Sequence, residues 1–231
     1  MMKYKIDKTI KTFNVRSRKL STTQINNINL YWPLIGINLD TKKFLMNKND
    51  FLNSYSPAIL EIGFGFGESL IYLSQKYKNI NFVGIEVYVP GISYCLKKIH
   101  ELNLKNIRII YVNALYFFIY YTQNIKFYKI NIFFPDPWPK RKHHKRRIIQ
   151  KELIKSIIKN LLVNGTLHII TDSLSYYESI LRILRKFDRL QNISKIFQNS
   201  LCKETITHSR FEKKALIKKN KIYNILYKKI F

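Results

Sequence analysis

From Ala58 onward, short apolar runs alternate with longer amphipathic runs, and this alternation constrains the fold more than any other feature of the chain. The apolar runs have the length of buried strands and read "AILEIG", "INFVGIEV", "IRIIYVN", "YKINIFF" and "GTLHIITD". The segments between them repeat apolar residues at helical spacing, as in Glu68–Tyr77, Pro90–Asn103, Ile148–Leu162 and Ser175–Phe187. Strands that alternate with helices form right-handed βαβ units. We therefore expect an α/β fold with a mainly parallel sheet covered by helices on both faces.

The two ends of the chain differ from this middle part. The final "KIYNILYKKIF" alternates well enough to form an antiparallel edge strand. Residues 1–55 carry scattered cations without clear periodicity, and we expect them to form a basic, partly mobile N-terminal extension. Within that extension, Tyr31–Gly36 is apolar enough to dock on the main body, which we expect to span residues 56–231.

Charge is the strongest compositional signal. The 231 residues include 41 Lys or Arg against 14 Asp or Glu, which gives a formal net charge of +27. Such an excess favours a polyanionic partner, either nucleic acid or an anionic membrane surface. The chain is also rich in Lys, Ile, Asn and Tyr throughout, as a bias toward A/T-rich codons would produce, so the charge alone does not identify the partner.

Other features argue against a membrane and against metal. No apolar run approaches the roughly 20 residues needed to span a bilayer, and the basic start has no apolar signal core behind it. Cys95 and Cys202 lie far apart, without a CxxC pair, which favours neither a metal site nor a disulfide. We therefore expect a soluble cytoplasmic protein that binds no membrane and no metal.

Ligands of parallel α/β sheets bind outside the carboxyl ends of the strands. In this sequence, the polar or glycine-rich residues at those ends are Glu61–Gly67, Glu86, Asn113, Asp136 and Asp172. These positions are the candidate site.

The glycine loop "EIGFGFGES" indicates the kind of ligand. Gly63, Gly65 and Gly67 allow the backbone to approach a ligand closely, although many such loops only turn a strand into a helix. The dinucleotide fingerprint GxGxxG would need a third glycine at position 68, where the chain has Glu68. A carboxylate there would compete with a bound pyrophosphate for the helix N-terminus, so NAD is disfavoured.

Two acidic residues flank the loop. Glu86 is placed to accept hydrogen bonds from two ribose hydroxyls, which NAD and S-adenosylmethionine both carry. Glu61 lies inside an apolar run, where an unpaired carboxylate is costly. A ligand ammonium group, such as that of a methionine moiety, would compensate its charge; a lysine from a neighbouring loop is the structural alternative.

The segment "FFPDPWPKRKHHKRR", Phe133–Arg147, combines a constrained carboxylate with a basic run. Prolines on both sides of Asp136 disfavour the right-handed helical conformation at Phe134 and at Asp136. We expect a stiff turn with a largely buried Asp136. The run Lys140–Arg147 holds six Lys or Arg, which we interpret as contacts to RNA phosphates, the alternative being a solvated face. His143 and His144 lack a carboxylate or Cys at metal-ligand spacing.

These motifs together resemble the tRNA (guanine-N7)-methyltransferases. "FNVRSRKLS", "YWP", "GIEVYVPG" and "THSRFEKK" extend the resemblance over nearly the whole chain. It implies a Rossmann-like class I methyltransferase fold, with a mostly parallel seven-stranded sheet and an antiparallel C-terminal strand. The implied reaction is methylation of N7 of guanine 46, in the variable loop of tRNA, with S-adenosylmethionine as cofactor.

The resemblance also implies roles for individual residues. Those that would hold the cofactor are Glu61, Gly63, Gly65, Gly67, Glu86, Asn113 and Asp136, and Asp136 is also implied to be catalytic. Those that would contact tRNA are Lys140, Asp172, Ser209, Arg210, Phe211 and Glu212; Asp172 could also cap the helix that follows it.

Two departures and three open alternatives accompany this interpretation. Asn113 replaces a common Asp, although its side-chain oxygen can still accept from the adenine amino group, and Ser209–Arg210 replaces Thr–Lys. The rival functions are a methyltransferase for another RNA base or for DNA, and a basic RNA-binding protein with an inactive methyltransferase fold. The sequence leaves the oligomeric state open between monomer and homodimer.

Overall fold

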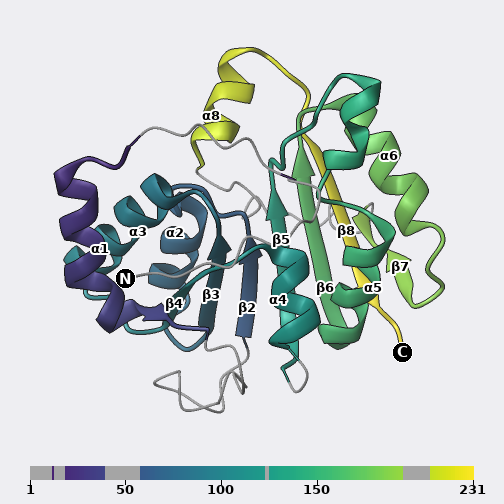
Figure 1. Cartoon of the computed structure of the whole chain (residues 1–231). Helices are drawn as coiled ribbons and strands as arrows, with labels where there is room; N and C mark the ends of the chain where they lie inside the picture. The colour runs from purple at the N-terminus through teal and green to yellow at the C-terminus, as the bar shows by residue number, and fades with distance from the viewer. Residues whose placement is uncertain (1–11, 13–18, 40–57, 123–124, 195–208) are drawn as a thin grey trace.

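The computed structural model describes residues 12, 19–39, 58–122, 125–194 and 209–231. Within them an eight-stranded sheet runs in the order β1-β4-β3-β2-β5-β6-β8-β7 (Figure 1). The strands are β1 (Gly36–Ile37), β2 (Ala58–Ile62), β3 (Asn81–Glu86), β4 (Ile107–Tyr111), β5 (Phe127–Phe133), β6 (Leu161–Thr171), β7 (Leu190–Asn192) and β8 (Tyr223–Lys229). The predicted α/β class is confirmed, with one strand more than the seven expected.

The sheet is parallel from β1 to β6. β8 runs antiparallel to both β6 and β7, as the alternation at the end of the sequence predicts. The order turns back on itself between β2 and β5, which pair in parallel although two βα units separate them along the chain. Such a reversal leaves an open crevice at the carboxyl ends of the central strands, where ligands of this fold class bind.

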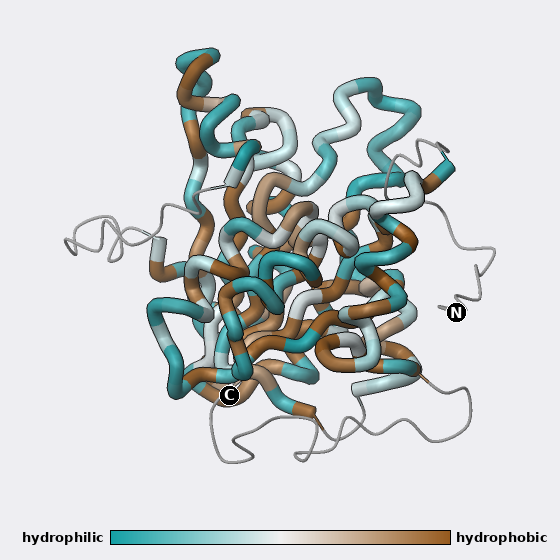
Figure 2. The backbone as a smooth tube through the Cα atoms, turned by 90° about the vertical axis from the view of Figure 1, so that its left-hand side faces the viewer, coloured by the Kyte–Doolittle hydropathy of each residue, from teal (hydrophilic) through white to brown (hydrophobic). Residues whose placement is uncertain are grey.

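Helices cover both faces of the sheet. One face carries α1 (Thr22–Ile35), α2 (Glu68–Lys76) and α3 (Val89–Glu101), and the other carries α4 (Ala114–Tyr120), α5 (Lys151–Asn160) and α6 (Leu174–Leu184). Among the described residues, two further helices are the 3-10 helix η2 (Arg141–Arg146) and α8 (Arg210–Ile217). Apolar strand residues alternate between the two cores, so that Ile59 packs with α3 while its neighbour Leu60 packs on the opposite face. Figure 2 shows the hydrophobic segments concentrated in the interior of the molecule.

The described part of the N-terminal segment joins the main body. Ser21 begins α1 with a capping box in which its hydroxyl and the Gln24 side chain satisfy each other's backbone N–H groups. Trp32 and Ile35 are buried against the α3 side of the sheet, and β1 pairs with β4 at Ile109 and Ile110. The expected docking of Tyr31–Gly36 is therefore seen as a helix and a short edge strand.

One predicted boundary is wrong. The sequence pattern extends a helix to Leu162, whereas α5 ends at Asn160 and β6 already begins at Leu161. Leu161 pairs with Phe127 of β5, and both side chains are fully buried, so tertiary pairing overrides the local helical pattern. No helix among the described residues is long and apolar enough to cross a membrane.

Candidate active site

The glycine loop lies at the carboxyl end of β2, in the centre of the sheet. Gly63, Gly65 and Gly67 all have positive φ, at 71°, 61° and 78°. Gly67 is the left-handed N-cap of α2, and a Cβ there would collide with the Cys95 thiol below it. The turn thus needs glycine both for its backbone conformation and for its packing on α3.

Glu61 is the buried carboxylate beneath this loop. Its residue is 3% exposed, and its Oε2 has no hydrogen-bond partner within the part of the chain that the structure describes. Burial raises the pKa of Glu61 to about 8; the nearby Ser69 hydroxyl opposes this shift, and the charge of Glu86 adds to it. A cationic ligand group could donate a hydrogen bond to this buried oxygen and stabilise the ionised carboxylate.

Glu86, at the end of β3, organises the neighbouring backbone. Its Oε2 accepts from the Gly65 N–H at 2.7 Å, and its Oε1 accepts from the N–H groups of Val87 at 2.6 Å and Tyr88 at 3.0 Å. Burial raises the pKa of this carboxyl, the three N–H donors oppose the rise, and the charge of Asp136 contributes to it. Glu86 therefore holds the glycine loop, and its carboxyl lies within electrostatic reach of Asp136.

Asn113 follows β4 and begins α4. Its Oδ1 accepts from the N–H of Leu115 at 3.0 Å and of Tyr116 at 3.3 Å, so the side chain is the N-cap of the helix. Both lone pairs of the carbonyl oxygen are thereby used. The side-chain amide nitrogen is the group that Asn113 has left to offer a ligand.

The turn after β5 carries Asp136 between two residues with unusual backbone conformations. Phe134 has φ 47° and Trp138 has φ 43°, both in the left-handed region that bulky side chains rarely adopt. Asp136 is exposed at the apex, so the expectation of a buried aspartate is wrong: its flanking prolines and strained neighbours lift it away from the core. The Phe134 N–H donates to the Ile170 carbonyl at 2.8 Å, which ties the turn to β6.

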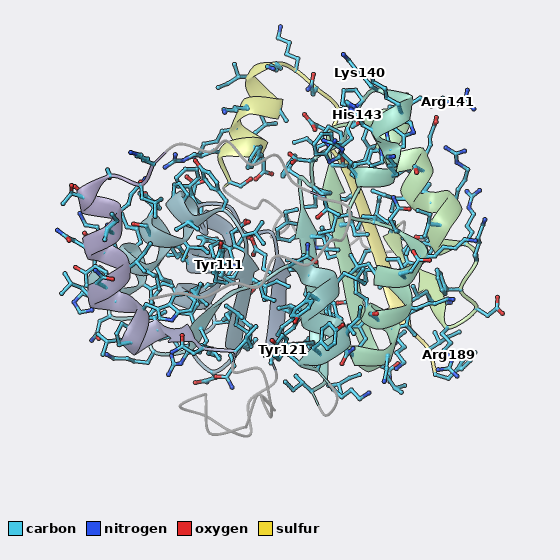
Figure 3. All side chains as sticks on the ribbon, viewed as in Figure 1. Tyr111, Tyr121, Lys140, Arg141, His143 and Arg189 are labelled. Atoms are coloured by element: carbon cyan, nitrogen blue, oxygen red, sulfur yellow. The ribbon has the colours of Figure 1, made fainter. Side chains whose placement is uncertain are left out.

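The basic run divides into two parts. Lys140, Arg141, Lys142 and Lys145 are exposed, and Figure 3 shows Lys140, Arg141 and His143 together on the same side of the molecule as α8. Arg147, by contrast, is only 2% exposed. The interpretation of the whole run as phosphate contacts is therefore wrong for Arg147, whose guanidinium is used inside the protein.

Asp172, after β6, does not cap α6. Ser173 does so, because its hydroxyl accepts from the Tyr176 N–H at 3.4 Å. The Oδ2 of Asp172 accepts from the Asn220 side chain at 3.1 Å, which links the loop after β6 to the segment leading into β8.

The segment Ser209–Glu212 opens α8, which lies at the top of Figure 1. Ser209 caps the helix by accepting from the Glu212 N–H at 3.2 Å. The Arg210 Nε lies 2.8 Å from Glu68 Oε1 in an ion pair. The guanidinium carbon of Arg210 lies 4.1 Å from the centroid of the Phe66 ring. Phe211 is 51% exposed and lies parallel to the Phe134 ring, with centroids 6.4 Å apart.

A cavity of about 130 Å³ lies between the glycine loop and α8. It is lined by Glu61, Gly63, Phe64, Phe66, Glu68, Ser69, Phe133, Ser209, Arg210, Phe211 and Lys214. The structure thus brings Ser209, Arg210 and Phe211 onto the same cavity as Glu61 and Gly63. The other predicted site residues are not part of the cavity wall: Gly65, Gly67, Glu86, Asn113, Asp136, Lys140, Asp172 and Glu212. The sequence pattern assigned no individual role to three residues of this wall: Phe66, Ser69 and Phe133. The sequence offers one indication for Phe66 and Ser69, which is that they lie within or just after the glycine loop.

Comparisons with known proteins place the chain among methyltransferases. Residues 55–225 match the protein-family model described as "Putative methyltransferase". The tRNA (guanine-N(7)-)-methyltransferase of Buchnera aphidicola subsp. Baizongia pistaciae (strain Bp) is 40% identical over 234 residues, which cover 100% of this chain and 96% of that protein. The tRNA (guanine-N(7)-)-methyltransferase of Vibrio parahaemolyticus serotype O3:K6 (strain RIMD 2210633) is 33% identical over 227 residues, with 98% and 94% covered.

Among solved structures, the plantazolicin methyltransferase BpumL in complex with SAH matches with a TM-score of 0.51 at 15% identity, over 76% of each chain. That likeness shows the fold alone. The two relatives show more, because their similarity extends over nearly the full length of both partners. The resemblance seen in the sequence motifs is confirmed: this chain belongs to the tRNA (guanine-N(7)-)-methyltransferase family.

Proposed function

We propose that this protein transfers a methyl group from S-adenosylmethionine to N7 of a guanine in tRNA, in the cytoplasm, and that the guanine is number 46 of the variable loop. Membership in the family supports the reaction class. The relatives' names carry the base and the atom but not the position, which follows from the family resemblance.

The observation that carries the proposal is the unpartnered Oε2 of Glu61 beneath the glycine loop. A buried acceptor without a donor is costly in a folded protein, so it marks a place for a ligand group. An ammonium group fits it, because a cation would both donate a hydrogen bond and stabilise the ionised carboxylate. S-adenosylmethionine carries such a group on its methionine part and, when bound, supplies the methyl group from its sulfonium.

Glu86 and Asn113 would hold the rest of the cofactor. Glu86 Oε2 accepts one N–H, so it retains capacity for a ribose hydroxyl. Asn113 follows β4, the strand that pairs with β3 and lies beside Glu86. The N–H of the preceding residue, Val112, donates to the Glu86 carbonyl at 3.2 Å. Its amide nitrogen would donate to the adenine ring, because its oxygen is occupied by the helix cap.

Asp136 would act on the guanine. N7 is a hydrogen-bond acceptor with an in-plane lone pair and no proton, so methylation there needs no general base. It needs alignment, which a carboxylate provides by accepting from the N1–H and the amino group on the opposite edge of the base. The same negative charge favours the positive charge that develops on the purine during transfer.

The exposed cations beyond the turn would bind the tRNA backbone. Lys140, Arg141, Lys142 and Lys145 form a positively charged strip directly after Asp136. Contacts of this kind neutralise phosphates and release counterions, and they position the nucleic acid without reading its sequence.

The test is mass mapping of the nucleosides formed when the protein and S-adenosylmethionine act on unmodified tRNA. We expect 7-methylguanosine in the variable-loop fragment, and its loss in Asp136→Ala with tRNA affinity nearly intact. Asp188→Ala, which removes another exposed carboxylate, is the matched control and should keep full activity. Methylation of a different nucleoside, or binding of S-adenosylmethionine without any transfer, would refute the proposal.

A further inference from the structure

Arg147 is a buried cation at the end of a run of exposed ones. It is 2% exposed, and its guanidinium makes three hydrogen bonds to other described residues. Its Nε donates to the Pro137 carbonyl at 2.9 Å, one terminal nitrogen donates to the Ser175 carbonyl at 3.4 Å, and the other donates to the Ser175 hydroxyl at 3.0 Å. The guanidinium therefore bridges the residue after Asp136 to the start of α6.

The platform on which Arg147 rests is buried and hydrogen-bonded. Its guanidinium carbon lies 4.7 Å from the centroid of the Tyr176 ring, and Tyr176 is fully buried. The Tyr176 hydroxyl accepts from the Ile149 N–H at 3.1 Å, so α6 and the segment leading into α5 are joined beneath the arginine. Burial raises the pKa of Tyr176, and the charge of Asp136 adds to the rise, which places that carboxylate within electrostatic reach of the platform.

The bridged turn stores strain. Phe134 and Trp138, on either side of the Pro135–Pro137 segment, both have positive φ. Strained conformations of non-glycine residues persist only where the surroundings over-determine them, and they concentrate at functional sites. Before Asp136, the Phe134 N–H donates to the Ile170 carbonyl. After Asp136, the Pro137 carbonyl accepts from the Arg147 guanidinium.

We propose that Arg147 is a positioning residue, which clamps the strained turn to α6 and so fixes the place of Asp136, and that it does not bind phosphate. The inference rests on the proposed function of Asp136. A lysine could not replace Arg147, because one ammonium cannot reach the Pro137 carbonyl and Ser175 in the same fork geometry or stack flat on Tyr176.

Arg141 provides a matched control, since it is an exposed arginine in the same run. The experiment compares Arg147→Lys and Arg147→Gln with Arg141→Lys and Arg141→Gln, using methyl transfer to tRNA, the salt dependence of tRNA binding, and hydrogen exchange of the Asp136 and Trp138 amides. In the Arg147 variants we expect kcat to fall about 10- to 100-fold. The KM for tRNA should change less than threefold, the salt slope should be unchanged, and exchange in the turn should be faster. In Arg141→Gln, which removes one of the proposed phosphate contacts, we expect a salt slope reduced by about 0.7–0.9 and unchanged exchange in the turn.

Ser175→Ala supplies a milder variant, because Ser175 is exposed and its loss does not endanger the fold. Ser175→Ala should lower kcat when Arg147 is present and should change kcat little in the Arg147→Lys background. This non-additive result is expected when two side chains act through one shared contact. Unchanged turn exchange, or a lower melting temperature with normal kcat in the folded fraction, would overturn the clamp. Failure of the unaltered protein to form 7-methylguanosine would instead refute the proposed function, while hydrogen exchange still decides whether Arg147 orders the turn.

Discussion

Arg210 donates its backbone N–H and its Nε to the two carboxylate oxygens of Glu68, at 2.6 and 2.8 Å. This pair joins the first residue of α8 to the first residue of α2, which follows the glycine loop directly. The sequence implied tRNA contacts for the segment Ser209–Glu212. Its contact with Glu68 and its share in the cavity wall also place it beside the glycine loop.

We therefore predict that Arg210→Ala weakens S-adenosylmethionine binding as well as tRNA methylation. The side chains are 46% and 24% exposed, so the pair itself contributes at most about 1 kcal/mol. The expected loss of cofactor affinity is about fivefold, the equivalent of that energy, with a small change in melting temperature. Lys213→Ala, an exposed change on the same helix, should leave cofactor affinity unaltered in the same calorimetric titration.

Glu61 should make the stability of the ligand-free protein depend on pH. Its folded pKa of about 8 exceeds the unfolded value of 4.5, so the folded state holds the extra proton between those values. The free energy of unfolding then falls as pH rises through that window and levels off above pH 8. Burial lowers the pKa of His168 to about 3, which acts in the opposite direction below about pH 6.5. Thermal unfolding between pH 6.5 and 8 should show a decline that Glu61→Gln removes.

The same carboxyl predicts proton release on cofactor binding. An ammonium group beside Glu61 lowers the pKa of the carboxyl, so binding at pH 7 should expel about one proton. Calorimetry in two buffers of different ionisation enthalpy should give different apparent binding enthalpies. Equal enthalpies in both buffers would mean that the ligand cation is bound elsewhere. Glu61→Gln should abolish the difference and weaken binding about 10-fold or more.

Asn113 permits a test that separates a helix cap from a ligand contact. Asn113→Ala should lower the stability by about 1 kcal/mol, because the two N–H groups at the start of α4 lose their acceptor. Asn113→Asp keeps that cap but replaces the amide N–H, which we propose donates to the adenine ring, with an oxygen, so cofactor affinity should fall while the melting temperature stays unchanged. Preserved or improved affinity would instead mean that the side chain at position 113 accepts from the adenine amino group.

Phe211 should matter for the substrate more than for the fold. It is 51% exposed, so Phe211→Leu should change the free energy of unfolding by less than about 0.5 kcal/mol. Its ring lies parallel to Phe134 beside the cavity, where it can stack on an exposed base. Loss of one base–aromatic stack costs about 1–3 kcal/mol, so tRNA methylation should fall by about 5- to 150-fold. Phe231→Leu, the same change at the distant C-terminal end, is the control (Figure 1).

The sequence predicted the strands that form the centre of the sheet, because buried strands such as Asn81–Glu86 must be apolar along their whole length. The elements it missed depend on partners far away along the chain. β1 has only two residues, and it is a strand because Gly36 and Ile37 pair with β4. Glycine at position 36 leaves room for the Trp32 ring packed against it, a contact that no local pattern reveals.

At the site, residue types at strand ends identified the carboxyl edge, the glycine loop and the turn with Asp136. They did not reveal what each group touches. Asn113 looks equally suited to a ligand and to a helix N-terminus, and in the structure its oxygen caps α4. Arg147 is one of six similar cations by sequence, and only the position of α6 buries it. The type and order of residues predict which chemical groups the site contains. Which of those groups are buried, and which groups they contact, depends on how segments distant in sequence pack together.

The turn that carries Asp136 also contains one of the two tryptophans of the chain. The Trp138 indole donates to the Thr12 carbonyl at 3.3 Å, lies under the Arg146 guanidinium at 5.0 Å, and meets the edge of His143 at 5.8 Å. The other tryptophan, Trp32, is buried in the core beside α3, and its indole N–H donates to the Asn38 side chain at 2.7 Å. Indole emission responds to nearby cations and to solvent, so Trp32→Phe would leave a single built-in fluorophore. Its colour and lifetime would report the arrival of a substrate beside Asp136, in real time and without any attached dye.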